Sequence, residues 1–224
     1  MSVALHPLDR DRVLADLSDM ARACLSLLEV YPTLDSTNSY LLAGARAGWP
    51  GGAVCLADQQ TAGRGRQGRN WLTPPDAGLA FSLLWRFGVS PDVLGGLSLA
   101  TGIAVVRALR SWGVRESGLK WPNDVWWRER KLGGILLESG GTAKEFYVVA
   151  GIGLNVALPV ADAAVIDQPW VDLREILGAA PIDRNRLAAA LIGELIAVYT
   201  RFETVGFAGF VDEWAGVDRI RGRR

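Results

Sequence analysis

Apolar and polar residues alternate along the chain in blocks that predict helices and strands in turn. Residues 8–28 carry apolar positions on one side and charges on the other, which indicates an amphipathic helix that Asp9 can cap. A second helix is expected after the polar residues 35–38, ending near Gly48. Longer patterns with helical spacing predict helices over 91–112, packed across a sheet, and over 184–202.

Apolar runs without helical spacing predict strands at 53–57, 79–85, 131–138 and 146–156, with a turn-bearing strand pair at 119–127. The run at 146–156 is apolar almost throughout, as in a central strand that is buried on both faces. Asn155 near its end is then a polar group that needs a partner. Helices and strands thus alternate along the chain, without internal repeats.

The long connection between the strands at 53–57 and 79–85 is rich in glycine and arginine. Glycine lets the backbone adopt positive φ and approach a ligand closely, and guanidinium groups match phosphate or carboxylate. Long loops inside compact domains are usually functional. The segment therefore predicts an anion-binding loop for a small phosphate-bearing ligand; its residues are Gly63, Arg64, Gly65, Arg66, Gly68 and Arg69.

Two other interpretations of this loop were weighed. The spacing Gly63-x-Gly65-x-x-Gly68 matches a dinucleotide-binding pattern, but that motif needs a helix to open at its last glycine, and Pro75 prevents a helix of any length. No Gly-Lys-Ser/Thr follows, so a P-loop is excluded. A solvated, disordered surface loop is the plainer alternative, which the flanking strands and Trp71 oppose.

Polar residues outside the loop also have two interpretations. Ser36, Thr37 and Asn38 exceed what one helix cap requires; they either decorate an N-cap or hydrogen-bond a ligand. Lys131 opens a strand that contains Gly134; its ammonium either extends to water or reaches a ligand, while a glycine inside a strand suggests close approach.

Composition limits the classes that remain. The 224 residues are 50% hydrophobic, enough for one globular domain, and 24 Lys+Arg balance 24 Asp+Glu, unlike a nonspecific nucleic-acid binder. Cys24 and Cys55 have no CxxC spacing and are expected to be free thiols, and His6 is the single histidine, so no His-based triad or Cys/His metal site is expected. Without a secretory pattern or a run of 18 apolar residues, we expect a cytoplasmic protein with no membrane partner.

Five motifs together carry a resemblance. Asp-Ser-Thr-Asn at 35–38, Gln-Thr-Ala-Gly-Arg-Gly-Arg-Gln-Gly-Arg-Asn-Trp at 60–71, Lys-Trp-Pro-Asn-Asp at 120–124, Lys-Leu-Gly-Gly-Ile-Leu at 131–136 and Gly-Ile-Gly-Leu-Asn at 151–155 resemble the catalytic domain of biotin protein ligases, also called biotin-[acetyl-CoA-carboxylase] ligases. The resemblance spans roughly residues 30–205. It implies an α/β (α+β) domain in which a mixed, largely central sheet is flanked by helices, related to class II aminoacyl-tRNA synthetases. It also implies a reaction in which biotin and ATP give biotinyl-5′-AMP before biotin passes to a carrier lysine.

The resemblance also implies roles for individual residues. Ser36, Thr37, Asn38 and Gln60 would line the biotin pocket, and Arg64, Gly65 and Arg66 would enclose the carboxylate and the adenylate phosphate. Lys131 would reach the reacting oxygens, and Gly134 would let the ligand lie against the backbone. Trp71 would cover the adenine or the valeryl chain, although a plain core aromatic is an alternative. The implied binding set also contains Gly63, Arg69 and Asn155, and the implied catalytic set is Arg64, Arg66, Lys120, Asp124 and Lys131.

Asp124 has two interpretations: it orients Lys120 or the acceptor amine, or it forms a structural salt bridge with Lys120 or Lys131. Biotin, ATP and Mg²⁺ are the implied small molecules, with Mg²⁺ shielding the phosphates and no metal site built by the chain itself. The implied partner is the biotin carboxyl carrier protein of acetyl-CoA carboxylase.

The implied organisation has three parts: a helical connector at 1–30, the catalytic domain at 31–210, and the start of a C-terminal SH3-like domain, itself missing, at 211–224. With only about 30 residues before the Asp-Ser-Thr-Asn motif, no winged helix and no specific DNA binding are expected; a homodimer formed through an exposed sheet is possible. Two alternatives stay open, a lipoate or octanoate ligase or transferase of the same superfamily and a non-catalytic binder such as a biotin sensor.

Overall fold

The computed structural model describes residues 6–88, 94–142, 145–159, 166–178 and 180–220. Within these ranges a sheet of seven strands runs in the order β1-β2-β3-β7-β6-β5-β4, with β1 parallel to β2 and every other neighbouring pair antiparallel. The predicted mixed central sheet is confirmed. Its strands are β1 (Leu27–Leu34), β2 (Ala53–Gln60), β3 (Gly78–Phe87), β4 (Ser117–Lys120), β5 (Asp124–Trp127), β6 (Arg130–Thr142) and β7 (Glu145–Asn155).

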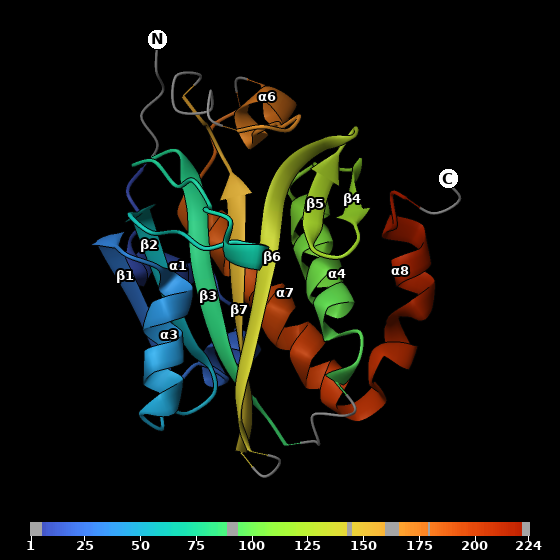
Figure 1. The fold of residues 1–224 in the computed structure, drawn as a ribbon. Coiled ribbons are helices and arrows are strands. Elements are labelled where there is room, and N and C mark those ends of the chain that lie inside the picture. The colour runs from blue at the N-terminus through green and yellow to red at the C-terminus, as the bar shows by residue number, and fades with distance from the viewer. Residues whose placement is uncertain (1–5, 89–93, 143–144, 160–165, 179, 221–224) are drawn as a thin grey trace.

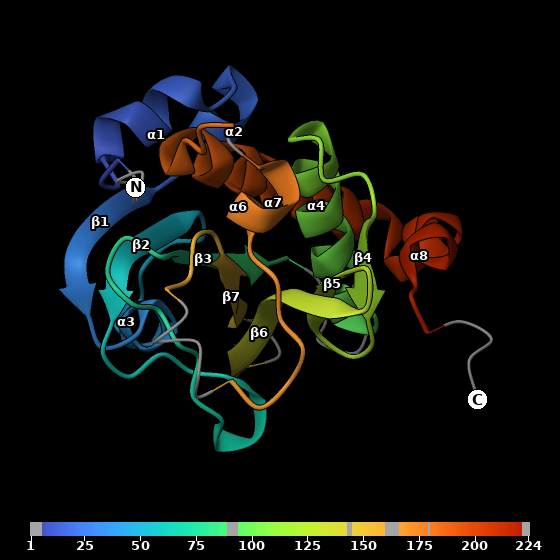
Figure 2. The ribbon, with the colours of Figure 1, turned by 90° about the horizontal axis from the view of Figure 1, so that it is seen from above.

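Helices cover both faces of the sheet, as Figure 2 shows from above. α4 and α7 pack on one face, with α1 and α2 against α7; α3 and the long β2–β3 loop lie on the other face, and α8 stands beside β4 (Figures 1 and 2). None of the helices in the described ranges is both long and apolar enough to cross a membrane. The helices are α1 (Arg10–Asp16), α2 (Asp19–Ala23), α3 (Thr37–Arg46), α4 (Leu97–Ser111), α6 (Leu173–Leu177), α7 (Arg184–Val205) and α8 (Val211–Val217), with short 3₁₀ helices η1 (Arg66–Gly68) and η3 (Phe207–Phe210).

The central strands present different residues to the two faces. Because side chains alternate along a strand, Phe81, Ile152 and Ile135, which lie opposite one another on β3, β7 and β6, all point into the main core with α4 and α7. The neighbouring row on the other face is small: Ala80, Gly153 and Gly134. This row leaves room above the sheet for a cavity.

The predicted helix over residues 8–28 is wrong. The segment forms two short helices, α1 and α2, because Leu17 adopts an extended backbone and the Ser18 hydroxyl caps a new helix by accepting from the Ala21 N–H. Leu28 then belongs to β1, where it pairs with Val54 of β2. The predicted cap is confirmed, since the Asp9 carboxylate accepts from the Arg12 N–H.

Other boundaries differ less. α4 begins at Leu97, after Gly96 in the left-handed region (φ 82°), so the prediction of a helix from 91 starts too early, and 91–93 lie outside the described residues. The strands at 53–57 and 131–138 extend to Gln60 and Thr142, and α7 continues to Val205. α6 and α8 were not predicted. Cys55 is buried and Cys24 half-buried, and both are free thiols as expected.

Candidate ligand-binding and active site

Buried polar side chains at the start of α3 form a closed hydrogen-bond network against the sheet. Ser36 caps α3, so that Thr37 and Asn38 of the first turn face β3. Ser82 of β3 joins them: its hydroxyl lies 2.6 Å from Asn38 Oδ1, to which it donates, and 2.7 Å from Thr37 Oγ1. Gly151 makes this approach possible, because an added Cβ would lie 2.2 Å from Asn38 Oδ1. The cluster is both a helix start and a preorganised polar wall.

Gln60, the last residue of β2, extends this wall toward the loop. Its Oε1 accepts from the Thr37 N–H at 2.9 Å and from the Thr37 hydroxyl at 3.2 Å, while its Nε2 donates to Thr73 Oγ1 at 3.3 Å. The side chain therefore connects the start of α3 to the far end of the loop.

Trp71 lies across the row of small residues on the sheet. A Cβ added at Gly153 would lie 2.4 Å from the Trp71 ring, and one added at Gly134 would lie 3.4 Å from it. At the base of the loop, the Trp71 N–H donates to the Gly63 carbonyl at 2.9 Å, so the two residues close the loop beneath the arginines. Trp71 is half-buried and lines the cavity, which favours the ligand-covering interpretation over that of a core residue.

The arginine loop is a folded turn. Gly65 N–H donates to the Arg69 carbonyl at 2.8 Å, and the chain reverses through Gln67 (φ 57°) and Gly68 (φ 73°). The backbone is extended at Arg69, directly after Gly68, so no helix begins there. This agrees with the exclusion of a dinucleotide-binding motif. The three guanidinium groups are exposed.

Two of these arginines already contact the opposite side of the cavity. Arg64 Nη2 lies 2.8 Å from Glu138 Oε1 of β6, and Glu138 also accepts from Asn38 Nδ2 at 3.0 Å. Arg66 Nη1 donates to Asn123 Oδ1 at 3.4 Å. The loop thus bridges from β2 to β6 and to the turn before β5.

Lys131 and Asp124 form an ion pair on the same sheet face, with 2.9 Å between Nζ and Oδ1. Both Lys131 and Gly134 point to this face although they are three residues apart, which a regular strand with period two does not allow. A register shift between β5 and β6 at Val125/Trp126 supplies the extra residue. The bulge therefore brings the lysine to the cavity.

This geometry shows what each of the two side chains contacts. Lys131 does not extend to water: its side chain is 16% exposed and its Nζ also lies 5.6 Å from the Trp71 ring centroid. Asp124 forms the salt bridge with Lys131, whereas Lys120 Nζ lies over the Trp126 ring at 4.4 Å from its centroid.

Asn155 finds the partners that its burial demands. Its Nδ2 donates to the Val171 carbonyl at 3.1 Å and to the Lys131 carbonyl at 3.4 Å. Lys131 N–H in turn donates to the Pro169 carbonyl at 2.9 Å. Asn155 therefore holds the segment before α6 against the start of β6, and this brings Trp170 to the cavity wall.

All the predicted site residues line one cavity of about 1480 Å³. They come from distant parts of the chain: Ser36, Thr37, Asn38, Gln60, Gly63, Arg64, Gly65, Arg66, Arg69, Trp71, Lys120, Asp124, Lys131, Gly134 and Asn155. In the part of the chain that the structure describes, no group of three or more His, Cys, Asp and Glu side chains is arranged to hold a metal ion.

Several lining residues escaped the sequence analysis. Trp121 and Asn123 belong to the Lys-Trp-Pro-Asn-Asp motif quoted above, and their place in that motif is the signal that could have identified them. Trp121 is 61% exposed at the cavity. Gln168 and Trp170 precede α6, where no strand or helix pattern marks them. Glu138 does not line the cavity but contacts Arg64 and Asn38, which do; it gave no signal because these partners are distant in sequence.

Comparison with known proteins gives consistent similarities. The family model of the Biotin/lipoate A/B protein ligase family matches residues 30–155. The chain is 41% identical over 196 residues to the Bifunctional ligase/repressor BirA of Escherichia coli, covering 87% of this chain and 60% of that protein. It is also 41% identical over 196 residues to the Biotin--[acetyl-CoA-carboxylase] ligase of Mycobacterium tuberculosis, covering 85% and 70% of the two chains.

Solved structures agree with this result. The biotin protein ligase from Aquifex aeolicus in complex with biotin and ATP is 30% identical and superimposes with a TM-score of 0.70, covering 87% of this chain and 79% of that one.

Proposed function

This chain belongs to the Biotin/lipoate A/B protein ligase family, and we propose that it activates biotin with ATP as biotinyl-5′-AMP and transfers the biotinyl group to a lysine of a biotin carboxyl carrier protein. One observation carries the proposal: a single cavity is lined both by uncharged hydrogen-bonding groups, Thr37, Asn38 and Gln60, and by cationic groups, Arg64, Arg66 and Lys131. That combination suits a ligand with a neutral polar head and an anionic tail.

In the first step, a carboxylate oxygen of biotin attacks the α-phosphorus of ATP, the bond to the bridging oxygen breaks, and pyrophosphate leaves with that electron pair. The carboxylate is already ionised at neutral pH, so no general base is needed. What is needed is positioning and the neutralisation of negative charge. We assign these tasks to Arg64, Arg66 and Lys131, with Arg69 at the loop rim.

Lys131 is suited to this task by its surroundings. Asp124 holds its ammonium at 2.9 Å on the cavity side of the sheet, and an ammonium has two further hydrogens with which to meet phosphate or carbonyl oxygens. Trp71, over Gly134 and Gly153, would cover the valeryl chain or the adenine.

In the second step, the neutral acceptor amine attacks the carbonyl carbon of the adenylate, the bond from that carbon to the phosphate oxygen breaks, AMP leaves with that electron pair, and the amine loses a proton to a base or to solvent. A lysine with pKa about 10.4 is neutral in only about one molecule in 2,500 at pH 7, so a nearby base that takes the proton helps. Asp124 is the candidate, with Lys120 at the rim of the same cavity.

We propose that Mg²⁺ enters with the nucleotide. The described residues offer no ligand cluster of their own, and Mg²⁺ commonly binds through substrate phosphates while keeping several waters. Bound in this way, it would shield the phosphate charges beside the loop arginines.

A biotin-dependent exchange of labelled pyrophosphate into ATP tests the proposal, with lipoate as the matched acid. Exchange with biotin and not with lipoate is expected. Exchange only with lipoate supports the alternative ligase, and biotin binding without exchange supports a sensor; either result overturns the proposal. Transfer is then measured with the biotinyl domain of a carrier protein and with its acceptor lysine replaced by arginine, which should remain unlabelled.

A further inference from the structure

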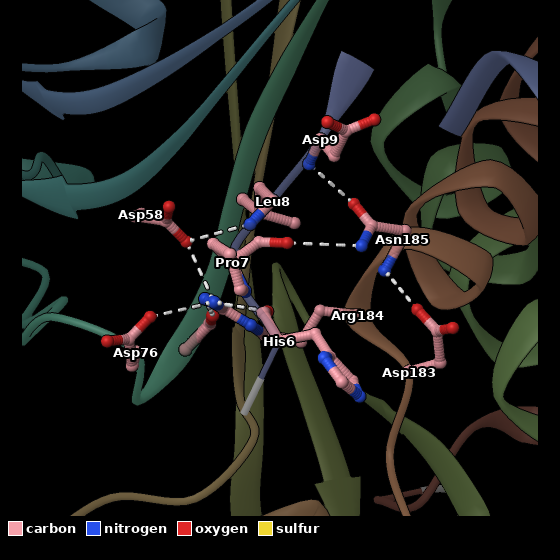
Figure 3. Close-up of polar contacts among 10 residues, drawn as sticks. His6, Pro7, Leu8, Asp9, Asp58, Asp76, Asp183, Arg184 and Asn185 are labelled. Atoms are coloured by element: carbon pink, nitrogen blue, oxygen red, sulfur yellow. Dashed lines mark hydrogen bonds and ion pairs between the residues drawn. The ribbon is translucent and has the colours of Figure 1, made fainter. Parts of the chain in front are cut away.

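A buried guanidinium stands at the base of the arginine loop, outside the cavity. Arg184, the first residue of α7, has a side chain that is 0% exposed. Its Nη2 lies 2.8 Å from Asp58 Oδ1 and 3.0 Å from Asp76 Oδ1 (Figure 3). Its Nη1 donates to the Gly78 carbonyl at 3.2 Å. Burying a charge is costly unless it is paired, and these partners compensate it.

The two carboxylates belong to opposite ends of the loop. Asp58 lies in β2, two residues before Gln60, and Asp76 lies two residues before the start of β3. Burial raises the pKa of Asp58 above its ordinary value, and the neighbouring Arg184 acts in the opposite direction. Arg184 therefore joins the end of β2 to the start of β3, and residues 61–75 run between these two points.

The N-terminal segment covers the same cluster. Arg184 Nη2 donates to the His6 carbonyl at 2.9 Å, and Asn185 Nδ2 donates to the Pro7 carbonyl at 3.2 Å (Figure 3). Asp9 N–H donates to Asn185 Oδ1 at 2.8 Å. Residues 6–9 thus lie as a strap over the guanidinium and keep water from it.

The arrangement is not what stability alone requires. Arg184 Nε is buried and has no hydrogen-bond partner among the described residues, so part of the desolvation cost is not compensated. An apolar side chain of similar volume would fill such a position at lower cost. Such an apolar side chain could not connect Asp58 with Asp76.

We propose that Arg184 is a positioning residue: by joining Asp58 to Asp76 it restricts the two ends of residues 61–75, and so determines how well the arginine loop closes over the adenylate. This inference rests on the proposed function. A loop whose ends are less restricted has more open conformations, and closure then costs more entropy. The arginines would consequently spend less time in contact with the ligand.

Asp76→Asn is the first test, because the Asp76 side chain is 60% exposed and asparagine tolerates its positive φ of 55°. Arg184→Lys is the second, since a lysine side chain is one bond shorter and its single nitrogen cannot reach both carboxylates and the Gly78 carbonyl at once. Arg12→Gln is the matched control: it removes the Arg12–Asp183 ion pair (2.8 Å) at the start of the same helix without touching the loop.

Three quantities are measured on the full chain: the rate at which biotinyl-adenylate escapes, the rate of trypsin cleavage after the loop arginines without substrate, and the Tm. For Asp76→Asn we expect escape and cleavage to rise roughly two- to fivefold, the effect of one partly exposed ion pair. Arg184→Lys should exceed this, and Arg12→Gln should change neither rate.

Equal loop cleavage and equal escape in Asp76→Asn and the parent protein would overturn the inference. So would increases that Arg12→Gln reproduces, because they would reflect stability alone. If Arg184→Lys does not fold, Asp76→Asn decides. If no adenylate forms at all, the proposed function fails while the cleavage rates still decide the role of Arg184.

Discussion

Replacing Gly153 with alanine should displace Trp71 and weaken binding of the ligand. The added Cβ would lie 2.4 Å from the Trp71 ring, where carbon atoms normally approach to about 3.5–4.0 Å. The ring must therefore move by more than about 1 Å. Because the backbone N–H of Trp71 is bonded to the Gly63 carbonyl at 2.9 Å, the shift falls mainly on the side chain, which must move away from Gly153.

This displacement determines the size of the expected losses in stability and in activity. Extra methyl groups in a packed region cost about 1–3 kcal/mol in the free energy of unfolding. A displacement of about 1 Å in a group that positions the substrate costs about 10²-fold in rate. Gly153→Ala should therefore lower the Tm by a few degrees and reduce biotin-dependent pyrophosphate exchange far more than that loss of stability explains.

Two other glycines provide controls. A Cβ at Gly134 would lie 3.4 Å from Trp71 and 3.8 Å from Lys131 Cε, contacts that a small shift accommodates, so Gly134→Ala should keep the Tm and still weaken biotin binding if the ligand lies on that backbone. A Cβ at Gly193, inside α7, meets nothing within 4 Å, and Gly193→Ala should keep activity and raise stability by about 0.5–1 kcal/mol.

Calorimetry with biotin, the exchange assay and thermal unfolding measure the three variants. If Gly153→Ala binds biotin with the parent affinity and unfolds at the parent temperature, Trp71 does not need its place on the small-residue row, and the argument from packing is refuted.

Three further outcomes are expected. Lys131→Met should slow adenylate formation about 10²–10³-fold, the range for losing one group that stabilises developing charge, with a smaller change in biotin affinity; equal losses in both would indicate a binding role only. Arg66→Ala should release biotinyl-adenylate faster, measured as retention after gel filtration, and unchanged retention would remove the loop from its assigned role. Glu213 accepts from Arg107 at 2.7 and 2.6 Å, and this hydrogen bonding lowers the pKa of Glu213. A carboxyl group whose pKa is lowered in the folded state stabilises the fold at pH values above its unfolded pKa of about 4.3, and this stabilisation is lost as the pH falls through the lower folded pKa. In urea unfolding, Glu213→Gln should therefore lower the free energy of unfolding by about 1 kcal/mol at pH 7 and by progressively less below about pH 4.3. A difference that does not depend on pH would contradict this.

The sequence is sufficient for the central strands and for most of the residues around the cavity because their signals are local. Apolar runs mark the central strands, and the polar and glycine-rich groups stand where those strands end. Asn155 illustrates this, since an amide in an otherwise apolar strand demands a partner, and the structure supplies the Val171 carbonyl.

Features that depend on distant pairing could not be predicted in this way. Amphipathic spacing across residues 8–28 does not show that Leu28 will pair with Val54 in a parallel strand, which ends the helical region early. The Lys131–Asp124 pair depends on a register shift that only the partner strand reveals. Glu138 acquires a meaning only when the fold brings Arg64 beside it.

At the site, acidic residues stand beside the cationic side chains whose charge they balance. Glu138 forms an ion pair with Arg64, and Asp124 forms one with Lys131. Each carboxylate therefore restricts the orientation of a cationic side chain. An arginine has five donors and a lysine three, and these contacts occupy only part of them. The unused donors can meet phosphate without first being ordered, so the entropy of orientation is lost on folding and not on binding. The neutral composition of the chain is therefore compatible with a concentration of cationic groups at the cavity.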